Sequence, residues 1–306
     1  METDVLASVI VPVRNGGGDL RELITCLEAQ TLPRDRFEVV VGDDGSTDGG
    51  TEGLETPDGW MRVVHGPPMN SYAARNRASR AGRTPVLAFC DADCRPDPDW
   101  LEQGLAALED ADVVAGRFRF IVPAELTVWA LIDMDGTKDH ERQVDNDNAE
   151  TANLFLRREL FDRVGGFDDT ISEHGDFDFV ERCVAAGARL TYAPDAVVWH
   201  PVRTRARPLL RSLWIYNHGY GERATRDGKL PESLKPRTWV PIVSTLRSRR
   251  RSGKSLSGPD KRWLAEHGVY PTLGQRLASL PLLYLALPYL RVAAQWSGWR
   301  VGRRLR

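Results

Sequence analysis

Residues 37–46 read FEVVVGDDGS, a run of apolar, mostly β-branched residues that passes directly into an acidic turn. The run predicts a buried strand with two aspartates at its carboxyl end. Similar runs lie on both sides of it, SVIVPV at residues 8–13 and PVLAF at residues 85–89. Apolar residues at helical spacing over residues 20–27 follow the first run. This alternation predicts an α/β domain with a mostly parallel sheet flanked by helices.

Acidic side chains follow two of the predicted strands. Asp43 and Asp44 follow the strand at 37–41, and Asp91-Ala92-Asp93 follows the strand at 85–89. Ligands of open α/β sheets bind at the carboxyl ends of the strands, so we expect both clusters to border one site. Asp91 and Asp93 project to the same side of an extended segment and offer the oxygen ligands that Mg²⁺ or Mn²⁺ prefers. An N-capping acidic turn and a tight Asp-Gly turn are the alternatives that need no ligand.

The 306 residues suffice for one large α/β domain with an appendage or for two small domains, and the charge is strongly uneven. Residues 201–306 hold 22 of the 41 lysines and arginines but only 5 of the 43 acidic residues. A basic C-terminal part predicts contact with an anionic partner. The four cysteines are scattered and the start of the chain lacks the pattern of a secretory signal, which together favour a reducing, cytoplasmic setting.

The C-terminal hundred residues interleave tryptophan and tyrosine with arginine and lysine, a mixture that suits an anionic membrane surface. Packing of these aromatics against the N-terminal domain is the alternative. The apolar stretch 277–290 contains Pro281 and Pro288 and is short for a membrane span, so it predicts an interfacial or buried helical hairpin. The chain carries no recognisable nucleic-acid module, and its acidic N-terminal part would repel a polyanion. We therefore expect no nucleic-acid partner and a peripheral position on the cytoplasmic face of the plasma membrane.

Two polar segments read as loops. Residues 133–150 are rich in aspartate, asparagine and other polar residues and predict a mobile loop or lid. Residues 247–257 are rich in arginine, serine and glycine and predict a flexible linker.

Three motifs in the first hundred residues resemble the consecutive signatures of family 2 glycosyltransferases, which have the GT-A fold. They are SVIVPVRN at 8–15, VGDDGSTD at 41–48 and DAD at 91–93. The resemblance continues in the family's order through AARN, NLFLRR, VGGFD and GDFDF, which begin at residues 73, 153, 164 and 175. It covers residues 6 to about 201 and implies a GT-A catalytic domain over residues 1–203, followed by a basic helical extension over 204–306.

The resemblance also implies a role for individual residues. Asp176 stands where the family keeps its general base, and His200 resembles a histidine that completes the metal site in some GT-A enzymes. Because Gly175 replaces the glutamate that often precedes the base, Glu173 or Asp178 could share its role. The residues implied for donor binding are Pro12, Val13, Asn15, Asp44, Arg75, Asn76, Asp91, Ala92 and Asp93, and those implied for the metal are Asp91, Asp93 and His200.

The implied reaction is an inverting, metal-dependent transfer of one sugar from a nucleotide-diphosphate sugar, UDP-linked in our interpretation, to a hydroxyl acceptor. Mn²⁺ or Mg²⁺ is the implied cofactor, and a membrane-associated enzyme suits a lipid-linked acceptor. Two alternatives remain at this point. A sugar-1-phosphate nucleotidyltransferase would share the sheet but needs a basic pair after the glycines of residues 16–18, and a non-catalytic nucleotide-sugar-binding scaffold would not need its carboxylates.

Overall fold

The computed structural model describes residues 5–135, 138–235, 245–246, 249–250 and 261–304. They form two compact units, the first built from residues up to 119 together with 138–201, and the second from residues 120–135 together with those from 202 onward. The sequence placed residues 120–135 in the first domain, whereas in the structure they group with the C-terminal part. The predicted linker at 247–257 lies largely outside the described residues.

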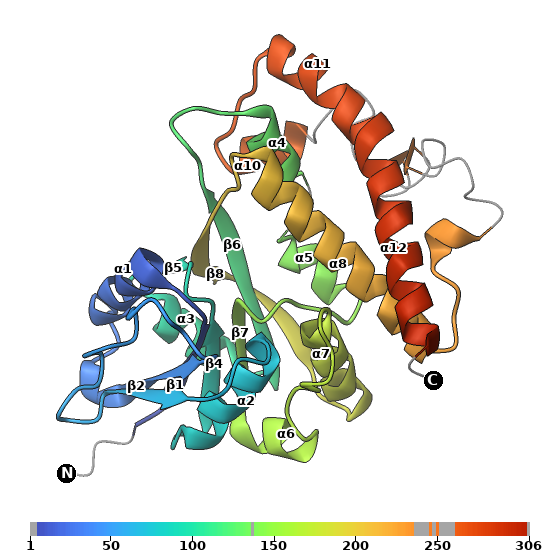
Figure 1. Ribbon diagram of the computed structural model, residues 1–306. Coiled ribbons are helices and arrows are strands. Elements are labelled where there is room, and N and C mark those ends of the chain that lie inside the picture. Colours follow the sequence, from blue (N-terminus) through green and yellow to red (C-terminus); the bar gives the residue numbers. More distant parts are fainter. Residues whose placement is uncertain (1–4, 136–137, 236–244, 247–248, 251–260, 305–306) are drawn as a thin grey trace. The chain divides into compact units, whose positions relative to one another are not determined.

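In the described part of the chain, eight strands form one sheet in the order β3-β2-β1-β4-β7-β6-β8-β5 (Figure 1). Strands β3, β2, β1 and β4 are parallel, whereas β7 pairs antiparallel with both β4 and β6. The prediction of an α/β fold with a nucleotide-binding type of sheet is confirmed. The strands are β1 (Ala7–Val13), β2 (Phe37–Asp43), β3 (Met61–His65), β4 (Val86–Cys90), β5 (Arg95–Pro96), β6 (Val113–Ile121), β7 (Asn153–Arg157) and β8 (Leu190–Pro201).

Helices cover both faces of the sheet, because successive side chains of each buried strand point to opposite sides. Val9 and Val11 of β1 belong to a core cluster with residues of α1 and α3, whereas Ile10 belongs to a second cluster with residues of α2, α6 and α7. The helices of this unit are α1 (Gly17–Glu28), α2 (Ser71–Ala81), α3 (Trp100–Ala107), α5 (His140–Val144), α6 (Arg158–Arg163) and α7 (Gly175–Ala185), with the short turn η1 (Arg34–Arg36).

A close contact fixes α2 against the end of β2. A Cβ atom on Gly42 would lie 2.4 Å from the carbonyl oxygen of Ala74, so only glycine lets the helix backbone come this near to the strand. The side chain of Asn70 caps α2 by accepting a hydrogen bond from the backbone N–H of Ala73. The helix that carries Arg75 is therefore held beside the carboxyl ends of the parallel strands.

The second unit is helical in its described part. It contains α4 (Val128–Met134), α8 (Ala206–Arg226), η2 (Glu232–Leu234), α10 (Lys261–Glu266), α11 (Leu273–Pro281), η4 (Leu282–Ala286) and α12 (Leu287–Arg304). The prediction of a helical hairpin over 277–290 is wrong: α11, η4 and α12 run on as one helix. The wide turn of η4 follows Pro281 directly, and a turn of this type accommodates the carbonyl group that a proline leaves without its usual partner.

Candidate active site

The loops after β1 and β2 are tied together at the carboxyl edge of the sheet. Pro12 and Val13 end β1 and are buried, and Asn15 follows them with a positive φ of 55°. The side-chain oxygen of Asn15 accepts a hydrogen bond from the backbone N–H of Thr47 (2.8 Å). The backbone N–H of Asn15 donates to the hydroxyl of Ser46 (2.9 Å). The sequence motifs at 8–15 and 41–48 thus form one continuous edge.

Asp44 is a buried carboxylate at this edge. Its backbone N–H donates to the carbonyl of Val13 (2.8 Å), and its Oδ1 accepts from the backbone N–H of Met69 (2.9 Å). Two guanidinium groups lie near it, that of Arg77 at 3.5 Å and that of Arg14 at 4.0 Å. A carboxylate in this position can accept hydrogen bonds from a nucleobase or a ribose hydroxyl.

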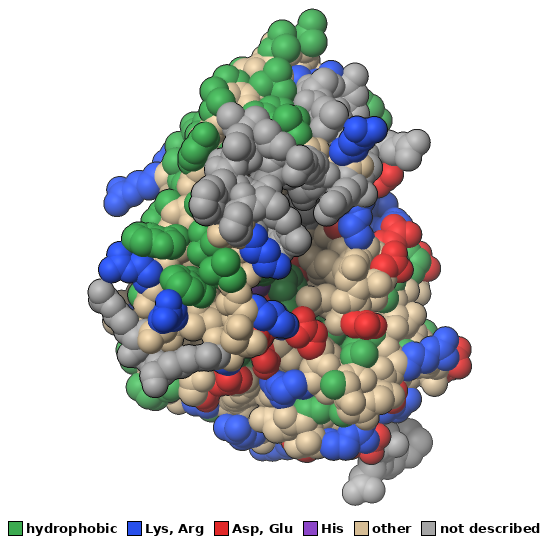
Figure 2. All heavy atoms as spheres, turned by 90° about the vertical axis from the view of Figure 1, so that its right-hand side faces the viewer, with side chains coloured by type: hydrophobic (Ala, Val, Ile, Leu, Met, Phe, Trp, Pro, Cys, Tyr) green, Lys and Arg blue, Asp and Glu red, His purple; other side chains and the backbone are tan. Residues whose placement is uncertain are grey.

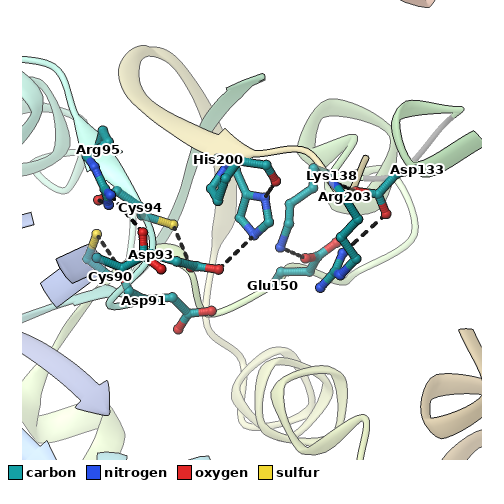
Figure 3. A network of polar contacts seen from close by, with 12 residues as sticks. Cys90, Asp91, Asp93, Cys94, Arg95, Asp133, Lys138, Glu150, His200 and Arg203 are labelled. Carbon is teal, nitrogen blue, oxygen red and sulfur yellow. Dashed lines mark hydrogen bonds and ion pairs between the residues drawn. The ribbon is translucent and has the colours of Figure 1, made fainter. Parts of the chain in front are cut away.

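Asp91-Ala92-Asp93 forms a turn, closed by a hydrogen bond from the N–H of Cys94 to the carbonyl of Asp91 (3.0 Å). The extended segment expected from the sequence is therefore wrong, and the two carboxylates have separate partners. Ala92 packs against the core. Oδ1 of Asp91 accepts from Nη2 of Arg75 (2.5 Å), whereas Oδ2 of Asp93 lies 3.8 Å from Nε2 of His200 (Figure 3).

The Asp93 and His200 pair suits a divalent cation. The backbone carbonyl of Pro201 accepts a hydrogen bond from Nδ1 of His200 (2.7 Å), so in the neutral ring Nε2 carries the lone pair and faces the Asp93 carboxylate. Two acceptors that face each other are compatible when a proton or a metal ion lies between them. The thiol of Cys94 joins them within 4.8 Å. Its hydrogen bond with Cys90 and its burial raise the pKa of the Cys94 thiol, which keeps it neutral and a poor metal ligand.

Arg75 and Asn76 play different parts although they are neighbours on α2. Arg75 is buried and bonds Asp91 and the hydroxyl of Ser71. The amide of Asn76 donates to the carbonyl of Phe167 (2.8 Å) and accepts from its N–H (2.9 Å). Arg75 thus orients a carboxylate of the site, whereas Asn76 holds the turn at residues 165–167.

Asp176 lies in the first turn of α7, and its Oδ1 accepts from the backbone N–H of Phe177 (3.0 Å). Burial, and after it the charge of Glu150, raises the pKa of Asp176 to about 6, although Arg75 and Lys138 oppose the shift. A carboxylate with a pKa just below neutrality is ionised at pH 7 and still basic enough to take a proton, as a general base requires.

The glycine before Asp176 has a steric reason. A Cβ atom on Gly175 would lie 2.8 Å from the ring of Tyr72, so the glutamate common in the family has no room here. Asp178, one of the two alternative bases, forms an ion pair with Arg182 (2.9 Å) on the next turn of α7. Asp178 therefore has a structural partner of its own.

A partly buried ion pair between Lys138 and Glu150 lies beside these groups. The prediction of a mobile loop over 133–150 gave no hint of it. Nζ of Lys138 lies 2.7 Å from Oε2 of Glu150 (Figure 3), and Gln143 donates to Oε1 of Glu150 (3.0 Å). Burial raises the pKa of Glu150, but the charge of Lys138 and the hydrogen bonds from Lys138 and Gln143 together lower it to about 2. The stretch contains α5 and a fixed pair of charges.

His140 forms hydrogen bonds that hold the backbone of Glu150 in place. The carbonyl of Gly116 accepts a hydrogen bond from its Nδ1 (2.7 Å), and its Nε2 accepts from the N–H of Glu150 (2.9 Å). Burial lowers the pKa of His140 to about 4, so the ring is neutral with one defined tautomer. No local sequence signal marks the pair, since its members are twelve residues apart in a polar segment.

The sheet carries two carboxylate clusters at the ends of parallel strands, and a carboxyl group of raised pKa lies nearby. This arrangement is that of an enzyme of the GT-A class. The model of the glycosyl transferase family 2 matches residues 8–165, and the chain belongs to this family. It is a glycosyltransferase.

Similar curated sequences are also named glycosyltransferases. Glycosyltransferase AglE of Haloferax volcanii is 32% identical over 64% of this chain and 67% of its own length. The pre-mycofactocin glycosyltransferase of Mycobacterium tuberculosis is 31% identical over 75% of this chain. The chain spans about half the length of the latter relative.

Solved structures share the fold. A mannosyltransferase of Pyrobaculum calidifontis in complex with GDP-Man and Mn²⁺ has a TM-score of 0.64 at 20% identity, over 97% of this chain and 86% of that one. S. aureus TarS in complex with UDP-GlcNAc has a TM-score of 0.54 at 17% identity, over 98% and 92% of the two chains.

Proposed function

We propose that this protein is an inverting, metal-dependent glycosyltransferase that moves a single sugar from a UDP-sugar to a hydroxyl acceptor. The observation that carries the proposal is the arrangement around Asp93: its carboxylate faces the lone pair of His200 at the sheet edge that also holds Asp44. A non-catalytic scaffold has no need for a carboxyl group such as Asp176, whose pKa lies near 6.

Each group has a part in the reaction. Asp44, with Pro12 and Val13, borders the nucleoside, and Arg75 keeps the Asp91 carboxylate in place. Asp93 and His200 would hold Mn²⁺ or Mg²⁺, which when bound stabilises the charge of the diphosphate. Two related folds were solved with nucleotide sugars, one of them also with Mn²⁺, which supports this assignment.

Asp176 takes the proton in the transfer step. The oxygen of the acceptor hydroxyl attacks the anomeric carbon from the face opposite the diphosphate, and the bond from that carbon to the phosphate oxygen breaks. The hydroxyl proton passes to the Asp176 carboxylate, and the nucleoside diphosphate leaves. Attack from the opposite face inverts the anomeric centre.

The donor site is tested by a thermal-shift screen of UDP, GDP, dTDP and CMP with and without Mn²⁺. UDP with Mn²⁺ is expected to raise the Tm of the wild type and of Asp110→Ala, an exposed acidic control, and to leave Asp93→Ala unchanged. Stabilisation by GDP alone would reassign the nucleotide, and no response to any nucleotide would overturn the donor site.

We also propose that the acceptor is lipid-linked and that the enzyme works at the cytoplasmic face of a membrane. The excess of arginine and lysine after residue 200 supports this, because cations near the surface are attracted to anionic lipids. Transfer to lipid-extractable material, measured with a radiolabelled donor and membranes, is the expected outcome. Label that stays in the aqueous phase would contradict it.

A further inference from the structure

The long C-terminal helix, formed by α11, η4 and α12, buries Leu283 and Ala294, but it also buries several polar side chains and exposes a row of apolar ones. The polar residues Arg276, Ser279 and Gln295 are buried (9%, 0% and 6% exposed), whereas Leu277 and Leu285 are 54% and 55% exposed. A helix on the surface of a water-soluble domain shows the opposite pattern, with its apolar stripe turned inward. Polar side chains inside and apolar side chains outside are the arrangement of helices that face lipid.

The exposed apolar side chains form one stripe. Leu273, Leu277, Pro281, Leu285 and Tyr289 follow one another at intervals of four residues. An α-helix has 3.6 residues per turn, so such a stripe would drift around a regular helix, and the wider turn of η4 in its middle reduces the drift. The five side chains therefore present a common apolar surface.

The neighbouring helix α8 buries Leu209 but likewise combines buried polar with exposed aromatic side chains. Asn217 and Thr225 are buried, whereas Trp214, Tyr216 and Tyr220 are exposed. Figure 2, which looks onto the side where α12 lies in Figure 1, shows hydrophobic side chains gathered in its upper and left parts with Lys and Arg among them.

The contact between α8 and α12 is built from backbone and polar groups. A Cβ atom on Gly221 would lie 2.1 Å from the carbonyl oxygen of Gln295, so the two backbones touch. Gln295 donates to Oδ1 of Asn217 (3.0 Å), and the hydroxyl of Thr225 donates to the carbonyl of Trp299 (3.2 Å). Small residues with hydrogen bonds between helices are typical of helix pairs in lipid, where apolar side chains gain nothing by turning inward.

Charge distinguishes insertion into one leaflet from a full span. Leu273–Arg303 is one helix, about 46 Å long, and only 22% of its most apolar 18-residue window is buried. Arg291 is exposed 18 residues after Leu273, about 27 Å along the helix, and Arg207 and Arg211 are exposed on α8. The uncharged surface of each helix is therefore shorter than the hydrocarbon thickness of about 30 Å. At the end of α12, Arg300 and Arg303 stack on tryptophan rings, a combination suited to headgroup depth.

We propose that α8 and the α11–α12 helix insert as a pair into one leaflet of an anionic membrane, with the stripe from Leu273 to Tyr289 among the acyl chains and the exposed arginines at the phosphates. The inference deepens the membrane-borne acceptor of the proposed function. It is tested without sugar transfer, so that either one can fail alone.

The test is flotation of the full chain with phosphatidylcholine vesicles that contain phosphatidylglycerol. Wild type is expected to float at low salt and to remain bound in 1 M salt, since acyl-chain contacts are not screened. The triple variant Leu277→Ser, Leu285→Ser, Tyr289→Ser is expected to lose about tenfold or more of its partitioning. The control variant Val5→Ser, Ile121→Ser, Val122→Ser removes three similarly exposed apolar side chains elsewhere and should bind like wild type.

Depth and fold are measured in the same samples. Brominated lipids are expected to quench part of the wild-type tryptophan fluorescence, and Trp296→Phe should remove part of that quenching because Trp296 is exposed on α12. Equal far-UV circular dichroism of all variants excludes unfolding as the cause of lost binding. Release by 1 M salt would overturn insertion, and a vesicle-indifferent dimer that the triple variant dissociates would assign the stripe to a second copy of the chain.

Discussion

The pH dependence of donor hydrolysis follows from the environment of Asp176. Its pKa lies near 6 in the folded protein against an ordinary value of 3.8. With that pKa about 90% of the carboxyl groups are ionised at pH 7 but only about 10% at pH 5, so the rate should fall about tenfold between these values. The assay is release of the nucleoside diphosphate from the donor that the nucleotide screen selects, with water as acceptor and kcat/KM followed against pH.

Two substitutions test whether the Asp176 carboxylate is the base that sets this pH dependence. Asp176→Asn should lower the rate by about 10² to 10⁴ while nucleotide binding persists. Glu150→Gln removes the charge that, after burial, raises the Asp176 pKa most, so the acid limb should move to lower pH. Asp178→Asn, whose parent carboxylate pairs with Arg182, is the matched control and should keep the wild-type profile. An acid limb near pH 4 in the wild type, or full activity of Asp176→Asn, would refute the assignment of the base.

Two further predictions concern stability. Gly42→Ala should push α2 off β2 and cost about 1 to 3 kcal/mol of unfolding free energy in urea titration, whereas Gly18→Ala, which meets nothing within 4 Å, should be close to neutral. Lys138→Met should cost about 1 to 3 kcal/mol because it leaves the partly buried Glu150 without its cation, and adding Glu150→Leu should recover most of the loss. Since the folded pKa of Glu150 is depressed to about 2 from 4.5, the wild-type pair stabilises above about pH 4.5 and this contribution disappears as the pH falls toward 2.

The sheet was predictable because its parallel strands are continuous apolar runs. The strands expected at 8–13, 37–41 and 85–89 are observed as β1, β2 and β4 with ends shifted by one or two residues. A strand that is buried on both faces needs a continuous apolar run, and this run can be recognised without knowing the rest of the fold. The carboxylates at the strand ends follow from the same reasoning, so the edge that carries the candidate site was also predictable.

The remaining features depend on partners that a local pattern does not show. The polar sequence around Lys138 and Glu150 suggests that both are solvated, and only the fold makes them a partly buried ion pair. The prolines at 281 and 288 suggested a break, but a wide turn lets the helix continue through them. Hydrophobic periodicity also assumes that the apolar face turns inward, and that assumption fails for α11 and α12.

The Gly221 contact between α8 and α12 has a consequence for kinetics. With the proposed insertion of this helix pair into one leaflet, the enzyme would be confined to the thin layer in which a lipid-linked acceptor diffuses. Confinement converts a bulk encounter into one at a high effective concentration, of millimolar order for short tethers, so a weak acceptor site suffices. At a fixed amount of acceptor, inert lipid added to the vesicles should slow the reaction by surface dilution, whereas the same lipid in separate vesicles slows it only by taking up enzyme.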